Sequence, residues 1–139
     1  MPRPLAATAE QLNNVLAETA FLKPYGFVVR SCAAGECTLV VPFSTAFERP
    51  GGIVSGMTIM GAADVAMWLA IMTERGTVER WVTTDMKTAF LRSARDEDVV
   101  CIARLLKLGT RTAYGTAECR GSDSDLLAHH VISYARIVV

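Results

Sequence analysis

The chain has 139 residues, enough for one domain with a buried core, and 51% of them are hydrophobic. Lys and Arg number 14, as do Asp and Glu, so the formal net charge is +0 and gives no support to a nucleic-acid or anionic-membrane partner. A mean hydropathy of +0.30 is high for a soluble monomer of this size, so we expect an apolar surface that a second subunit covers.

The N-terminal segment follows a polar helical pattern after Arg3 and lacks the charged and then apolar run of a signal peptide, which predicts a cytoplasmic protein. The 4 cysteines form no Cys-x-x-Cys pair. Cys32 and Cys37 flank a predicted turn and could bridge. In a reducing compartment, however, free thiols packed as small apolar groups are favoured.

The first half of the chain predicts two helices and a hairpin. Residues 8–20 form a short amphipathic helix that starts with a Thr-x-x-Gln capping box. Residues 25–31 and 36–42 are short runs on either side of an Ala-Gly turn, which predicts a hairpin. A loop at residues 43–52 leads into a long apolar helix over about residues 55–73.

In the second half of the chain, apolar residues follow the two-residue periodicity of strands throughout. Its four runs, separated by turn residues, cover residues 81–92, 99–108, 111–120 and 126–138. The order is therefore α-β-β-α-β-β-β-β, and the short connections force antiparallel pairing. We expect a single domain over residues 1–139 of the α+β class, with an antiparallel sheet wrapped around one long central helix.

Asp64 is the one ionisable residue between Gly51 and Met72. This stretch is long enough to span a bilayer, but glycines weaken its first half and no basic cluster flanks it, so we expect a buried core helix. A carboxylate in such a helix needs compensation. It is either a structural group satisfied by hydroxyl donors such as Thr58 or Thr83, or a catalytic carboxylate poised by apolar surroundings.

Gly56 opens the long helix after a glycine-rich loop. Free N–H groups at a helix start can polarise a carbonyl, and glycine lets a ligand approach closely; simple N-capping by Ser55 is the alternative interpretation. Gly56 and Asp64 are eight residues apart, roughly 12 Å along one helix. If both act on one carbonyl, they must come from different subunits.

Two segments resemble a known family. Val54-Ser55-Gly56-Met57, followed by Ile59, Ala62 and Asp64, resembles the V-H-G-G-x-I-x-x-L-x-D signature of phenylacetyl-CoA thioesterase-like (PaaI-like) hotdog proteins. Residues 82–92 are similar to the strand that precedes an F-L-R-P-A turn in that family. The resemblance covers residue 49 to the C-terminus and implies the hotdog fold, with no cofactor.

The resemblance also implies roles for three residues. Asp64 would activate water as a general base or attack the thioester directly. The Gly56 N–H from a partner chain would polarise the thioester carbonyl, and Thr83 would orient the attacking water. In plain alternation, Thr83 points away from the face of Val82 and Met86, so its role needs a β-bulge.

The chain departs from the family pattern at four positions. Ser55 stands where the family has His, Met57 where it has a second Gly, Arg49 where it often has Asn, and Ser93 where it has Pro. Ser55 can hydrogen-bond near the carbonyl but cannot take a proton at neutral pH as His can.

Further candidates are basic residues and apolar side chains. Four basic residues could bind the coenzyme A phosphates or could simply be solvated charges on the surface: Arg92, Arg111, Lys87 and Arg95. An acyl pocket could include Met57, Met60 and Trp68. His129 and His130 share a strand and point to opposite faces, so no metal site is expected.

The sequence therefore predicts a homodimer, or a dimer of dimers, that hydrolyses an acyl-CoA or aryl-CoA thioester. The alternative is a non-catalytic hotdog module that binds acyl-CoA or a related ligand. The altered glycine motif favours this alternative and the retained Asp64 disfavours it. A hydratase on the same fold needs a His within residues 43–76, where there is none.

Overall fold

The computed structural model describes residues 3–138, so Met1, Pro2 and Val139 of the expected domain lie outside the described residues. The helices are α1 (Ala9–Glu18) and α2 (Gly56–Arg75), with the 3₁₀ helices η1 (Ala20–Tyr25) and η2 (Thr45–Phe47). The strands are β1 (Val28–Ala33), β2 (Glu36–Val41), β3 (Glu48–Arg49), β4 (Ile53–Val54), β5 (Arg80–Phe90), β6 (Val99–Leu108), β7 (Thr112–Arg120) and β8 (Leu126–Ile137).

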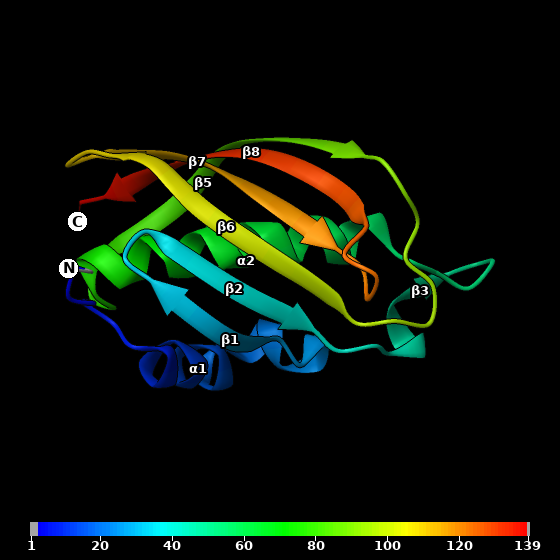
Figure 1. Cartoon of the computed structure of the whole chain (residues 1–139). Helices are drawn as coiled ribbons and strands as arrows, with labels where there is room; N and C mark the ends of the chain where they lie inside the picture. Colours follow the sequence, from blue (N-terminus) through cyan, green and yellow to red (C-terminus); the bar gives the residue numbers. More distant parts are fainter. Residues whose placement is uncertain (1–2, 139) are drawn as a thin grey trace.

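Six of the strands form one antiparallel sheet in the order β1-β2-β6-β7-β8-β5. The sheet curves around α2, which runs along its inner face, while α1 lies beside β1 (Figure 1). The side-chain amide of Asn13 joins α1 to the backbone of Val29 by two hydrogen bonds of 2.8 and 3.1 Å. This arrangement is the hotdog fold, and it confirms the predicted α+β architecture.

Helix α2 is the core of the molecule. It is the one helix within residues 3–138 that is long and apolar enough to cross a bilayer, yet 67% of its most apolar window is buried inside the protein. Gly76 ends it with a positive φ of 79°, which favours glycine, and its N–H donates to the Met72 carbonyl at 2.8 Å. The predicted buried core helix is therefore confirmed, and it extends two residues beyond the predicted end.

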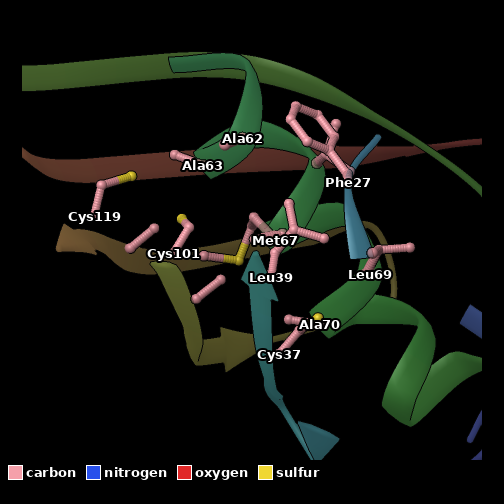
Figure 2. Close-up of a cluster of buried hydrophobic side chains, with 14 of the residues drawn as sticks. Phe27, Cys37, Leu39, Ala62, Ala63, Met67, Leu69, Ala70, Cys101 and Cys119 are labelled. Atoms are coloured by element: carbon pink, nitrogen blue, oxygen red, sulfur yellow. The ribbon is translucent and has the colours of Figure 1, made fainter. Parts of the chain in front are cut away.

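Small residues let α2 approach the sheet closely. Ala62, Ala63 and Ala70 of α2 face Cys37 of β2 and the cysteines of β6 and β7 (Figure 2). All four cysteines are free and three are buried, which confirms the thiol prediction. On β7, Gly115 makes room for α2, since a Cβ there would lie 2.6 Å from Met67 Cε.

The segment before β1 differs from the prediction. The capping box of Thr8 and Gln11 starts α1 as expected. However, Tyr25 ends η1 instead of starting a strand, and β1 begins at Val28. Gly26 is the cause: its left-handed φ of 68° terminates η1 and turns the chain before extended backbone begins.

The predicted loop at residues 43–52 also contains ordered elements. Besides η2 it holds β3, which pairs with β4 just beyond the loop to form a separate ribbon. These strands have two residues each, which is too short for alternation to be read from sequence. The ribbon places Arg49 opposite Ile53, next to the start of α2.

Strand β5 forms one edge of the sheet, and no segment within residues 3–138 pairs with its outer side. Trp81 is buried, but Val82 and Phe90 are 42% and 53% exposed. A long open edge with apolar side chains is a ready site for pairing with another strand.

Candidate active site

Asp64 is half-buried in the first half of α2 and lines a cavity of about 570 Å³. The walls come from η1 and the residues after it, from α2, and from the start of β5. They are rich in aromatic side chains, namely Phe21, Tyr25, Phe27, Trp68, Trp81 and Tyr134. A carboxylate beside an apolar cavity of this size suits a reaction at the polar end of an apolar ligand.

Two hydroxyls donate to one oxygen of the Asp64 carboxylate. Thr83 Oγ1 lies 2.5 Å from Asp64 Oδ1, and Tyr134 Oη lies 2.7 Å from the same atom. Tyr134 Oη is also 2.7 Å from the Asp64 backbone carbonyl. No residue in the described part of the chain donates to Oδ2, which leaves that oxygen available for chemistry.

The structural interpretation of Asp64 holds in part, and its catalytic role stays a prediction. The carboxylate is satisfied on one side by Thr83, one of the two donors considered, whereas Thr58 makes no hydrogen bond to it. Burial, and then the charge of Asp64, raises the pKa of Tyr134 well above its usual value, so its phenol is a protonated donor.

A β-bulge turns Thr83 toward Asp64. The register between β5 and β8 shifts between Thr83 and Asp85. Before the bulge Trp81 and Thr83 face α2, and after it Met86 packs against the core. Plain alternation would have turned Thr83 away, and the extra residue resets the parity.

The amide of Gly56 is free at the start of α2. Ser55 caps the helix, because its Oγ accepts from Met57 N at 3.1 Å and its carbonyl accepts from Thr58 N and Ile59 N. Gly56 N–H has no acceptor in the described part of the chain. The capping interpretation of Ser55 is confirmed, and it leaves the helix-start amide of Gly56 open for a ligand.

Gly56 lines a second hollow of about 400 Å³, together with Arg49, Phe90 and Arg92. The Phe90 ring packs on Gly56, and a Cβ at that position would lie 3.1 Å from Phe90 Cζ. Arg92 also forms an ion pair of 2.5 Å with Asp125. A free amide with two guanidinium groups nearby suits an anionic ligand.

Asp64 and Gly56 therefore line two different cavities of one chain. Their separation along α2 is roughly 12 Å, as their sequence spacing requires. A single chain does not bring the carboxylate and the free amide to one reacting group.

The remaining sequence candidates are spread over the molecule. Trp68 lines the Asp64 cavity, Met57 is 83% exposed at the start of α2, and Met60 is half-buried. Arg111 is exposed in the β6–β7 turn, where its carbonyl accepts from Arg136 N. That turn and the end of β5 lie at opposite ends of the sheet, so Arg92 and Arg111 do not meet within one chain (Figure 1).

Sequence reasoning missed Tyr134 and Phe90. Both lie within segments predicted as strands, and neither was named as a candidate for the site. The signal for Tyr134 was parity: it shares the inward face of β8 with His130 and Ile132, and all three are buried.

A second polar cluster is buried in the core, away from both cavities. His130 Nδ1 is 2.7 Å from Thr88 Oγ1, and His130 Nε2 is 3.4 Å from Cys119 Sγ. A hydrogen bond from Cys101, and then the neighbouring His130, lowers the pKa of Cys119 below its usual value. Within residues 3–138 no three His, Cys, Asp or Glu residues are placed to hold a metal ion.

A hotdog fold that presents a helix carboxylate to an apolar cavity defines a hydrolase of the thioesterase class. The chain belongs to the thioesterase superfamily, whose family model matches residues 51–128. The matched region contains Gly56, Asp64 and Thr83 and ends before Tyr134.

Individual relatives agree with this assignment. A protein of Thermoplasma acidophilum that carries the name of an esterase is 30% identical over 105 residues, which are 76% of this chain and 79% of the relative. A structure from a Silicibacter species, assigned as a thioesterase, has a TM-score of 0.86 at 28% identity and covers 96% of this chain and 94% of its own. The Escherichia coli PaaI protein from the phenylacetic acid degradation operon shares the fold, with a TM-score of 0.83 at 18% identity over 94% of both chains.

Proposed function

We propose that this protein hydrolyses an acyl-CoA or aryl-CoA thioester to the free acid and coenzyme A, in the cytoplasm, at a site shared between two subunits. The observation that carries the proposal is the Asp64 carboxylate. One of its oxygens is held by two hydroxyls, and the other is free beside an apolar cavity. Membership of the thioesterase superfamily supports the type of bond that is cleaved.

The chemistry follows from the free oxygen Oδ2. It either removes a proton from a water molecule whose oxygen attacks the thioester carbonyl carbon, or attacks that carbon itself. In both routes negative charge develops on the carbonyl oxygen, the C–S bond breaks, and the departing thiolate takes up a proton. A backbone N–H at a helix start is suited to stabilise that oxygen, and the free amide of Gly56 is such a group.

The partner subunit brings Gly56 to Asp64 if two β5 edges pair in antiparallel fashion. In each chain Asp64 is bonded to Thr83 near the start of β5, and Gly56 packs against Phe90 at its end. A twofold axis near Met86 and Lys87 would set Thr83 opposite Phe90 of the partner subunit. Asp64 would then lie next to Gly56 of the partner subunit, and each dimer would hold two equivalent sites.

The two cavities suit the two ends of such a substrate. The aromatic walls of the Asp64 cavity favour an apolar acyl or aryl group. The hollow of Gly56 carries the guanidinium groups of Arg49 and Arg92, which favour the phosphates of coenzyme A. Arg111, at the other end of the sheet, would take part only from a different subunit.

The test is thiol release from a panel of short-chain, long-chain and aromatic acyl-CoAs. Wild type should turn over at least one of them, and Asp64→Asn and Asp64→Ala should lose that activity while remaining folded. Asp123→Asn, an exposed carboxylate outside both cavities, is the matched control and should keep wild-type rates. Activity that survives in Asp64→Ala would exclude this carboxylate as the catalytic group.

A second candidate function is a non-catalytic module that binds acyl-CoA. The feature that favours it is the start of α2, where Ser55 uses its Oγ as a helix cap and Met57 is 83% exposed. Saturable binding of an acyl-CoA without turnover, unaffected by Asp64→Asn, would establish the binding module in place of the enzyme.

A further inference from the structure

We propose that Tyr134 is a positioning residue that fixes the Asp64 carboxylate and directs its free oxygen into the cavity; the inference rests on the proposed function. The first observation is the double contact of the phenol. Tyr134 Oη lies 2.7 Å from Asp64 Oδ1 and 2.7 Å from the Asp64 carbonyl oxygen. One hydroxyl therefore contacts both the side chain and the backbone of the same residue.

The second observation concerns which oxygen is held. Thr83 and Tyr134 both donate to Oδ1, so the plane of the carboxylate is set by two bonds on one side. The geometry of the carboxylate then fixes Oδ2 on the side away from the two hydroxyls. A nucleophile or base held in one orientation gains rate because the reacting atoms start in the productive geometry.

The third observation is that Tyr134 is the better anchored of the two donors. It is 4% exposed and lies on β8, which has a partner strand on each side. Thr83 is exposed and lies on the edge strand β5, beside a bulge. The two residues are direct cross-strand partners, and Tyr134 is the donor that its own chain holds from both sides.

The fourth observation is that Tyr134 can act only as a donor here. Burial, and then the charge of Asp64, raises the pKa of Tyr134, so the phenol keeps its proton at neutral pH. Tyr134 borders the cavity, but its hydroxyl is bonded to Asp64. Its role is therefore to orient the carboxylate and not to exchange protons with substrate.

The first test is steady-state kinetics of Tyr134→Phe, which keeps the ring and removes the hydroxyl. The value of kcat should fall about 10- to 100-fold while KM stays within about threefold, because the change removes only a hydroxyl that is bonded to Asp64. Tyr114→Phe, an exposed tyrosine on β7, is the control and should keep both values. A folded Tyr134→Phe variant with wild-type kcat and only a lower Tm would overturn the proposal.

A second variant keeps the test independent of how well Tyr134→Phe folds. In Thr83→Val only Tyr134 still donates to Oδ1, and valine keeps the β-branched shape of threonine, so the strand should be retained. The Asp64 carboxylate should keep its orientation in the crystal structure of this variant, and kcat should fall by less than in Tyr134→Phe. A carboxylate that swings away in Thr83→Val would show that Thr83 is the group that holds it.

The crystal structures also separate this inference from the proposed function. If wild type turns over no acyl-CoA, the proposed function fails, but the orientation of Asp64 can still be compared in wild type and Tyr134→Phe. The inference requires one carboxylate orientation in wild type and a different or divided one in the variant. An unchanged carboxylate would refute the positioning role whatever the enzyme's activity.

Discussion

The ring of Phe90 packs directly on Gly56: a Cβ added to the glycine would lie 3.1 Å from Phe90 Cζ and 3.3 Å from Cε1. This contact joins the end of β5 to the start of α2. It also means that the free amide of Gly56 is bordered on one side by an aromatic ring. The three atoms nearest to the added Cβ all belong to the side chain of Phe90, which is 53% exposed and can move by a few tenths of an ångström.

Gly56→Ala should therefore fold but lose activity. The Phe90 ring can shift to accept the methyl group, so Tm should remain close to that of wild type. The methyl group narrows the approach to the amide that we assign to the thioester oxygen, and the loss of one such donor costs about 10²- to 10³-fold in kcat. Thermal unfolding and thiol-release kinetics measure the two quantities. Wild-type kcat in a folded variant would remove Gly56 from the mechanism.

Mixing two inactive variants should restore activity if the site is shared. Asp64→Asn retains Gly56, and Gly56→Val retains Asp64. A dimer with one chain of each kind contains one site with both groups intact. Half of randomly mixed dimers have this composition, so the mixture should recover about a quarter of wild-type activity after refolding together.

The control for this experiment is a mixture of Asp64→Asn with Asp64→Ala, which has no intact site and should stay inactive. Sedimentation before and after mixing establishes whether the subunits form dimers or dimers of dimers. A mixture of Asp64→Asn and Gly56→Val that forms dimers but gains no activity would contradict the composite site.

Much of the fold could be predicted because the apolar residues of most elements follow a clear helical or strand periodicity. The strand predicted at residues 99–108 matches β6 at both ends, and the last three strands of the prediction differ from β6, β7 and β8 by one residue at most. The early segments were less certain because short elements carry little periodicity. Gly26 ended η1 where a strand was expected, and the two-residue strands β3 and β4 gave no pattern.

The candidate site was predictable only where a residue type conflicted with its surroundings. Asp64 stood out as a carboxylate in an apolar helix, and the glycine at position 56 stood out as a helix start. Tyr134 gave no such signal, since a tyrosine among apolar strand residues is normal in a core. The orientation of Thr83 depended on a bulge, which shifts parity without any marked change in composition.

The pH dependence of stability should report the burial of Tyr134. Its pKa is raised above the ordinary value of 10.0, first by burial and then by Asp64. Above about pH 10 the unfolded chain releases a phenol proton that the native state keeps, so the free energy of unfolding falls as pH rises through that window. Below about pH 10 this loss of stability is absent. Tyr134→Phe lacks this proton, so its stability should decline less steeply.

Urea unfolding of wild type and Tyr134→Phe from about pH 8.5 to about pH 11 measures the difference, with Tyr114→Phe as the control for an exposed tyrosine. All other ionisable groups are the same in the three proteins, so their contributions cancel in the comparison. Parallel declines in wild type and Tyr134→Phe would show that the phenol of Tyr134 ionises as readily in the native state as in the unfolded one.

Gly115→Ala should destabilise the protein because the added methyl group has no space. It would lie 2.6 Å from Met67 Cε and also against the backbone carbonyl of Arg104, which cannot yield as a side chain can. Overpacking of this kind costs about 1–3 kcal/mol in the free energy of unfolding.

Gly61→Ala is the matched comparison for this change, because nothing lies within 4 Å of the added Cβ. Replacing a glycine inside a helix by alanine should stabilise α2 by about 1 kcal/mol. Urea unfolding of both variants measures the two opposite shifts. If Gly115→Ala were as stable as wild type, the contact between α2 and β7 would be able to relax. Since Met67 lies one turn of α2 beyond Asp64, such relaxation would also move the carboxylate, and a lower kcat in a stable Gly115→Ala variant would reveal it.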